Sequence, residues 1–261
     1  MFQAIQALVL GAVQGLTEFL PVSSSAHLII VPWMMKWSDP GLAYDVALHL
    51  GTLVALLIYY WREWLAMAAS ITNGNREKRR LLALLIVASI PGAVIGLAFE
   101  KQAETIFRSP MLIAVAMAAL GIILWLADRA APQRRKLDEI GFGDALLIGL
   151  SQAFAIVPGV SRSGATITMA RIVRIERQDA ANFSFLMATP IIAGAGLVEG
   201  RHLLHSAMNA DVLIGFAAAT IFGLVAIAGL ISYVRTRSYA PFAWYRVIVA
   251  AFVIALFLIR R

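Results

Sequence analysis

Cysteine is absent from the 261 residues of this chain, and charged residues are scarce at 14%. Without cysteine, neither disulfide bonds nor cysteine-ligated metals can contribute to the protein. So few charges, beside 61% hydrophobic residues, do not suit a soluble domain of this length. The composition therefore indicates a membrane protein.

The apolar residues gather in stretches that are long enough to cross a bilayer, for which a helix needs about 20 mostly apolar residues. Six stretches qualify: residues 43–61, 81–99, 111–127, 182–198, 212–234 and 242–259. Residues 1–20 lack a basic start and run into a polar motif, so we expect no cleaved secretion signal. We therefore predict an all-α integral membrane protein with six transmembrane helices.

The net charge of +7 reflects an excess of basic residues, most of which lie between the predicted spans. Loops of membrane proteins carry such residues for orientation, so we expect no nucleic-acid partner. The larger basic group includes Arg62, Arg80, Arg135 and Arg235. The positive-inside rule places that group in the cytoplasm and both termini outside.

Each half of the chain also contains an apolar stretch that is broken in the middle, at residues 2–20 and 26–35 and again at residues 144–157 and 164–173. Proline lacks the amide donor and clashes with the preceding turn, so a proline at each break interrupts the helix. Non-helical backbone at membrane depth is tolerated only where it is buried in protein or lines a wet cavity. We therefore predict two re-entrant helix-loop-helix hairpins whose loops line a cavity.

The two halves resemble each other in sequence. An offset of 138 positions superposes like residues: Gly11 on Gly149, Gln14 on Gln152, Ser23 on Ser161 and Ser25 on Ser163. We interpret residues 1–129 and 138–261 as the units of an internal duplication, with chance similarity of glycine-rich apolar segments as the alternative. Three spans per unit is an odd number, so the second unit is inverted in the membrane.

The first loop, residues 14–27, reads QGLTEFLPVSSSAH. Gln14 and Glu18 are four residues apart and share one helix face. The next helix carries His27 in its first turn and is preceded by serines at capping positions, Ser23, Ser24 and Ser25. An exposed helix start offers free amides and a positive dipole end, which suits an anion such as phosphate.

The second loop, residues 158–166, reads PGVSRSGAT. Its glycines allow the backbone to approach a ligand, and Arg162 can grip phosphate through two parallel hydrogen bonds. The candidate phosphate-binding residues of both loops are Ser23, Ser25, Ser161, Ser163, Gly164 and Thr166. An ionised side chain at mid-membrane costs about 2.5 to 3.5 kcal/mol, so Glu18 and Arg162 need partners or water. A bare ion pair between them is the structural alternative, but it does not call for the surrounding hydroxyls.

The chemistry that this set could perform is phosphoryl transfer. Ser24 could attack phosphorus with His27 as general base and later acid, while Arg162 and loop amides neutralise charge. His27 itself, or an activated water, is an alternative nucleophile. Glu18, with Gln14 beside it, could hold a divalent cation, because hard cations prefer oxygen ligands.

A second polar pair lies within a predicted span. Asp45 and His49 are four residues apart on one helix face. They could line the same cavity, but we expect them to bond to each other.

The two motifs, EFLPVSSSAH and PGVSRSGAT, in this order and spacing, resemble the signatures of the undecaprenyl-diphosphate phosphatases of the bacitracin-resistance type. The resemblance covers essentially the whole chain. It implies an enzyme of the bacterial inner membrane that hydrolyses undecaprenyl diphosphate to the monophosphate and inorganic phosphate. This reaction recycles the carrier lipid for peptidoglycan synthesis and confers bacitracin resistance.

By motif position, the resemblance assigns the functional set to Glu18, Ser24, His27, Ser161, Arg162 and Thr166. Gln14 stands where many members have glutamate, so metal binding here is weaker or needs another carboxylate. The resemblance also implies dependence on Mg²⁺ or Ca²⁺ and a catalytic cavity that faces the periplasm.

A transporter or a flippase of a phosphorylated polyprenyl lipid is the main rival, since inverted repeats with broken helices also build secondary carriers. A carrier needs an anion site but no nucleophile with a base beside it. Small residues in the spans, such as the run from Ala193 to Gly196, permit close packing within one chain or between two copies, which leaves a homodimer open.

Overall fold

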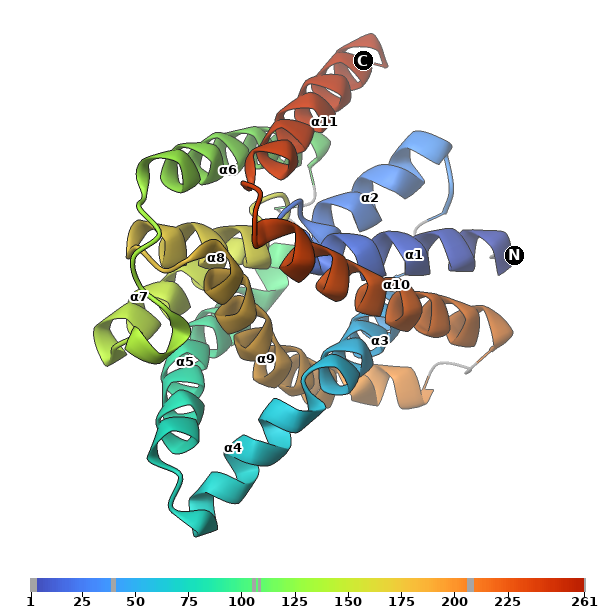
Figure 1. Cartoon of the computed structure of the whole chain (residues 1–261). Helices are drawn as coiled ribbons and strands as arrows, with labels where there is room; N and C mark the ends of the chain where they lie inside the picture. The colour runs from blue at the N-terminus through green and yellow to red at the C-terminus, as the bar shows by residue number, and fades with distance from the viewer. Residues whose placement is uncertain (1–3, 39–40, 105–106, 108, 206–208, 261) are drawn as a thin grey trace.

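The computed structural model describes residues 4–38, 41–104, 107, 109–205 and 209–260. In this part of the chain the regular elements are helices, as predicted (Figure 1). Their bounds are α1 Ala4–Phe19, α2 Ser24–Met35, α3 Leu42–Tyr59, α4 Trp61–Asn73, α5 Arg76–Glu104, α6 Pro110–Ala130, η2 Leu137–Glu139, α7 Phe142–Gln152, η3 Ala153–Ile156, α8 Arg162–Ile172, α9 Arg177–His205, α10 Ala210–Val234 and α11 Ala240–Ile259.

Five of the described helices are long and apolar enough to cross a membrane, namely α5, α6, α9, α10 and α11. The remaining predicted span, residues 43–61, corresponds to α3, which is bent by 73° from α4 at a break of one residue and counts as a span together with it. The chain is therefore a multi-pass membrane protein. Two details differ from the sequence prediction: no helix was predicted between the spans 43–61 and 81–99, where α4 lies, and residues 76–80, expected between spans, form the first turns of α5.

Both predicted breaks are present as helix-loop-helix hairpins. The first consists of α1 and α2, and the second of α7, η3 and α8. In Figure 1 the first hairpin opens toward the side where the N-terminus lies, and the second opens toward the opposite side. Their loops therefore meet in the interior of the molecule.

Glycines let the first helix of each hairpin pack closely on a spanning helix. Gly11 of α1 lies against α10, where an added Cβ would come within 2.4 Å of the Gly215 carbonyl oxygen. Gly149 of α7 lies against α5, where an added Cβ would come equally close to the Ala88 carbonyl oxygen, at 2.4 Å. Equivalent glycines thus make equivalent contacts, which agrees with the internal duplication. The duplication itself stays a prediction.

A buried ionic cluster ties four helices together at one end of the bundle. Asp128 of α6 accepts hydrogen bonds from Arg171 Nε at 2.9 Å, Arg177 Nε at 2.8 Å and the Tyr239 backbone amide at 3.0 Å. Arg171 is fully buried, and a buried charge is tolerated when it is paired in this way. The cluster supports the fold and lies outside the cavity described next.

Candidate active site

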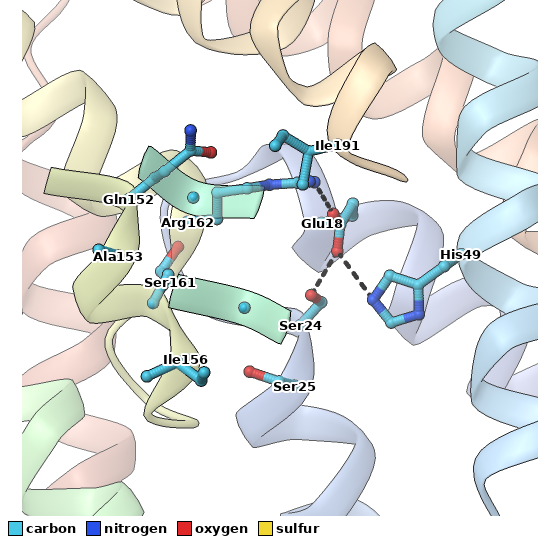
Figure 2. A pocket seen from close by; sticks show the side chains of 13 residues that line it. Glu18, Ser24, Ser25, His49, Gln152, Ala153, Ile156, Ser161, Arg162 and Ile191 are labelled. Atoms are coloured by element: carbon cyan, nitrogen blue, oxygen red, sulfur yellow. Dashed lines mark hydrogen bonds and ion pairs between the residues drawn. The ribbon is translucent and has the colours of Figure 1, made fainter. Parts of the chain in front are cut away.

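A polar cavity of about 230 Å³ lies where the two loops meet. Its walls come from both hairpins and from α3, α5 and α9: Glu18, Ser24, Ser25, His49, Gly92, Gly96, Gln152, Ala153, Ala155, Ile156, Ser161, Arg162 and Ile191. Figure 2 shows that Arg162, Ser24 and His49 of this lining point toward Glu18. The prediction that the broken helices line a cavity is thereby confirmed.

Glu18, near the end of α1, is the centre of the polar contacts (Figure 2). Its Oε2 atom accepts hydrogen bonds from Ser24 Oγ at 2.5 Å and from Gln14 Nε2 at 3.0 Å. Its Oε1 atom accepts from Arg162 Nη2, and His49 Nε2 lies 3.7 Å from Oε2. Glu18 is 7% exposed, so the carboxylate is held by donors from α1, α2 and α8 rather than by bulk water.

Ser24 and Arg162 are the first residues of α2 and α8, the second helix of each hairpin. The residue before each, Ser23 and Ser161, has a positive φ, of 78° and 71° respectively. Such values are uncommon for a residue other than glycine and cluster at functional sites. The two helices therefore start from matching turns, and each presents its first side chain to the cavity.

The two turns differ in how their serines are used. Ser161 Oγ accepts a hydrogen bond from the Gly164 amide, 3.0 Å away, and so caps its own helix. Ser23 makes no such cap, and its Oγ accepts from the Gly159 amide of the other loop at 3.1 Å. A helix start that lacks a side-chain cap is suited to an anion, because its amides are not satisfied within the helix.

The predicted phosphate-binding residues fall into two groups. Ser25 and Ser161 line the cavity. The others are buried outside the cavity lining, Ser23 in the first loop and Ser163, Gly164 and Thr166 in the first turns of α8. Ser163 Oγ donates to the Leu20 carbonyl oxygen at 3.2 Å, and Thr166 Oγ1 bonds to Ser184 Oγ at 2.7 Å. These buried hydroxyls hold the loops in place and do not face the cavity.

His27 is buried and does not line the cavity. Its Nδ1 atom bonds to the Ser23 carbonyl oxygen at 2.7 Å, and its Nε2 atom bonds to the Tyr245 hydroxyl at 2.8 Å. Its ring also stacks on Tyr245. Both nitrogens of His27 are thus engaged away from Ser24, so this geometry does not support the predicted pairing of Ser24 with His27 as its base, and the acidic group within hydrogen-bond distance of Ser24 Oγ is the Glu18 carboxylate.

His49 lines the cavity, although a bond to Asp45 was expected from the sequence. Its Nδ1 atom donates to the backbone carbonyl oxygen of Asp45 at 2.7 Å, so the expected side-chain bond between the pair is replaced by a bond within the helix. Its Nε2 atom is left to face Glu18 and the cavity (Figure 2). A polar residue within an apolar span was the only signal in the sequence.

The residues predicted to hold a cation, Glu18 and Gln14, lie side by side, and Glu18 supplies the one carboxylate of the pair. Gln14 is fully buried, and its amide donates to Glu18 while its carbonyl oxygen finds no hydrogen-bond partner among the described residues. In that part of the chain no three His, Cys, Asp or Glu residues are arranged for a metal. Mg²⁺ is commonly held by one or two carboxylates together with substrate phosphates, and Glu18 suits that arrangement.

An apolar cavity of about 620 Å³ adjoins the polar one. Ser25, His49 and Ile191 belong to the walls of both. Its lining includes Ile90 and Leu97 of α5 and Pro190 and Val198 of α9, two of the helices long and apolar enough to span a membrane. An apolar cavity beside the polar one thus lies between spanning helices.

Fold and site together define a multi-pass membrane protein with a polar cavity where two hairpin loops meet and a larger apolar cavity beside it. The family model "Bacitracin resistance protein BacA" matches residues 7–252, and the chain belongs to this family. It is similar to the undecaprenyl-diphosphatase of Moorella thermoacetica, at 50% identity over 98% of this chain and 99% of the relative. The undecaprenyl-diphosphatases of Pelotomaculum thermopropionicum and Desulforudis audaxviator are 47% and 49% identical, over 96% and 98% of both chains.

Proposed function

We propose that this chain is a phosphatase that hydrolyses undecaprenyl diphosphate to undecaprenyl phosphate and inorganic phosphate. Relatives that carry the name of this activity match almost its whole length. The observation that carries the proposal is the group of Ser24, Glu18 and Arg162 at one cavity, where a hydroxyl, a carboxylate and a guanidinium meet beside an apolar groove.

In the first step, the Ser24 hydroxyl attacks the terminal phosphorus of the lipid diphosphate. Glu18 Oε2, 2.5 Å from Ser24 Oγ, accepts the serine proton. The bond from that phosphorus to the bridging oxygen breaks, and undecaprenyl phosphate leaves with the bonding electrons. Ser24 then carries the phosphoryl group.

In the second step, water attacks the phosphoserine after Glu18 has released its proton. One water proton passes through Glu18 to the Ser24 oxygen as the bond from serine to phosphorus breaks, and the remaining hydroxyl stays on the released phosphate. Arg162 neutralises charge on the transferring oxygens in both steps, since its guanidinium has further N–H groups besides the one bonded to Glu18. Glu18 and Arg162 hold each other when no phosphate is bound.

A divalent cation, Mg²⁺ or Ca²⁺, completes this proposal. Glu18 together with the diphosphate oxygens would hold it, and it would neutralise charge on the leaving group. Gln14 supports Glu18 by donating to it and brings no charge of its own.

In this proposal the apolar cavity binds the prenyl chain of the substrate. The diphosphate lies at the start of α2, and the first part of the prenyl chain lies along α5 and α9. Because α5 and α9, which line this cavity, are spanning helices, we infer that the substrate reaches the site sideways from the bilayer. This geometry supports a lipid-linked diphosphate over a soluble one.

We place the protein in the bacterial inner membrane with the cavity facing the periplasm, where it recycles the carrier lipid for peptidoglycan synthesis and confers bacitracin resistance. The support is the family and the bacterial origin of the relatives.

Phosphate release from undecaprenyl diphosphate by the purified chain, with and without a chelator, tests the activity and the cation together. Trapping with substrate labelled on the terminal phosphate then tests the nucleophile, and we expect the label on Ser24. Ser24→Ala should lose both label and release, whereas Ser70→Ala, at a buried serine of α4, should keep both. No release by the unaltered chain would contradict the proposed function. Label on His27, or release without any label, would exclude Ser24 as nucleophile.

A further inference from the structure

Arg246 lies in the middle of α11 and is fully buried, with 0% exposure. A charge buried within a spanning helix normally pairs with an opposite charge or with backbone carbonyls. None of the ion pairs found among the described residues includes Arg246. The proposed steps, which use Ser24, Glu18 and Arg162, give Arg246 no role.

The guanidinium of Arg246 is held by backbone carbonyl oxygens. Nη2 donates to Gly159 at 2.8 Å and to Val160 at 2.9 Å, both in the second loop. Nη1 donates to Pro21 of the first loop at 3.3 Å, and Nε donates to Met117 of α6 at 3.1 Å. One side chain thus joins both loops to the helices α6 and α11.

Gly164 leaves the space that this side chain needs. A Cβ added at Gly164 would come within 2.6 Å of Arg246 Nη1. Gly164 stands in the first turn of α8, two residues after Arg162. The glycine of the motif SRSGAT is therefore explained by the guanidinium that passes beside it, and not only by close approach of a ligand.

The neighbouring residue in the sequence makes a parallel contact. The Tyr245 hydroxyl bonds to His27 Nε2 at 2.8 Å, so two successive residues of α11 contact the first hairpin. Direct bonds between the loops, such as Ser23 Oγ with the Gly159 amide, add to this connection. The carbonyls of both loops lie outside helices and need donors inside the membrane, which Arg246 supplies.

From this geometry we infer that Arg246 is a positioning residue, which sets the distance between Ser24 and Arg162 by binding the carbonyls of both loops. The inference rests on the proposed function, because its catalytic readout uses that reaction. Arg246 does not touch the cavity, so its effect reaches the chemistry through the two loops.

Arg246→Lys keeps the positive charge but replaces the planar fork of donors with one ammonium group. A misplacement of about 1 Å can cost about a hundredfold in rate, so we expect kcat to fall by that order while KM changes less than about threefold. The matched control is Arg171→Lys in the Asp128 cluster, which alters an equally buried arginine away from the cavity. It should lower the melting temperature and leave kcat of the folded protein within about threefold. Unchanged kcat in Arg246→Lys would refute the inference.

A double-mutant cycle separates positioning from general loss of stability. Gly164→Ala should push the guanidinium from its place and lower kcat about tenfold by itself. In the Arg246→Lys background the clash with Nη1 is removed while the 3.0 Å approach to Ser161 Cβ remains, so the same glycine change should cost less than it does alone. Fully additive effects of the two changes on kcat would count against the inference.

A distance measurement makes the outcome independent of the substrate. The chain has no cysteine, so cysteines placed at the exposed positions Met35 and Ile172, the ends of α2 and α8, can be spin-labelled selectively. We expect Arg246→Lys to shift or broaden the distance distribution between the labels, and Arg171→Lys to leave it unchanged. An unaltered distribution in Arg246→Lys would overturn the inference even if the chain proved to act on another lipid.

Discussion

The two loops at the centre of this protein share a backbone and differ in chemistry. Both turn through a serine of positive φ into a helix, and both contain a pair of serine hydroxyls, 3.3 Å apart in the first loop and 3.2 Å apart in the second. At equivalent positions in the offset of 138, the side chains diverge: Glu18 against Ile156, Ser24 against Arg162 and His27 against Ala165. The same turn thus presents a carboxylate and a hydroxyl from one side and a guanidinium from the other.

The difference shows how a duplicated frame can produce one asymmetric site. Glu18 and Ile156 both line the cavity, so the two equivalent positions face the same space. Only one of them needs to carry charge for the reaction that we propose. The following predictions test this division of roles.

Removing the proton acceptor should have the largest effect. Glu18→Gln keeps the volume of the side chain but cannot take the Ser24 proton, so kcat for phosphate release should fall about 10²- to 10⁴-fold. Ile156→Leu, at the equivalent position of the second loop, should change kcat less than about threefold. A Glu18→Gln variant that retains a tenth of the activity would mean that the base lies elsewhere.

Arg162→Lys tests the guanidinium that the second hairpin contributes to the site. Lysine keeps the charge but loses the planar fork that can bind Glu18 and a phosphate oxygen together, so kcat/KM should fall about 10²- to 10³-fold. Arg235→Lys, at an exposed arginine beyond α10, is the matched control and should be neutral. Equal activity of the two variants would show that only charge is required at position 162.

The equivalent glycines Gly11 and Gly149 test the comparison at the level of packing. An alanine at either position would meet a backbone carbonyl, and we expect each change to lower the free energy of unfolding by about 1 to 3 kcal/mol. Gly229→Ala in α10, where an added Cβ meets nothing within 4 Å, should instead raise it by up to about 1 kcal/mol. Denaturant unfolding in detergent measures all three. A loss at only one glycine would show that the two contacts are not equivalent.

Gln14→Glu tests the proposed cation. A second carboxylate beside Glu18 should lower the Mg²⁺ concentration for half-maximal activity by about tenfold, within the range by which neighbouring groups tune metal affinity. Activity measured across a Mg²⁺ titration in chelator-buffered solution gives this value. If the rate of phosphate release by the unaltered chain is the same with and without the chelator, the cation is not part of the mechanism.

The smallest effect is expected at His27. His27→Gln keeps a donor for the Ser23 carbonyl and removes a group that touches no part of the cavity, so kcat should stay within about tenfold. Tyr245→Phe removes the other bond of the same ring and should behave alike. Should His27→Gln lose as much activity as Glu18→Gln, the histidine takes part in the chemistry after all.

Much of the fold could be predicted because long apolar runs indicate membrane spans and prolines indicate breaks in helices. The span of α6, expected at 111–127, is observed at Pro110–Ala130, and both broken stretches appear as hairpins. Helix α4 was missed because its sequence, Trp61–Asn73, mixes apolar with polar residues and lacks the continuous run that marks a span. The bend before it depends on tertiary packing, which the local sequence does not specify.

The candidate site could be predicted in part for a related reason. Glu18, Ser24 and Arg162 could be predicted because polar and ionisable residues at a helix break within a membrane are costly unless they bind a partner or a ligand. The structure brings the three side chains together. Which of His27 and His49 faces the cavity depends on how α2 and α3 are rotated about their axes. The periodicity of the sequence gives these rotations only roughly. Arg246 carried a signal, a lone charge within a predicted span, but its partners are backbone atoms that no motif reveals.

The apolar cavity beside the site has a kinetic consequence. At about 620 Å³ it is the size of a pocket for one drug-like molecule, so it can enclose only the first part of an undecaprenyl tail. The rest of the tail stays among the membrane lipids throughout the reaction. The concentration that governs turnover is therefore the mole fraction of substrate in the bilayer, and adding inert lipid at constant substrate should slow this protein as dilution with water slows a soluble enzyme.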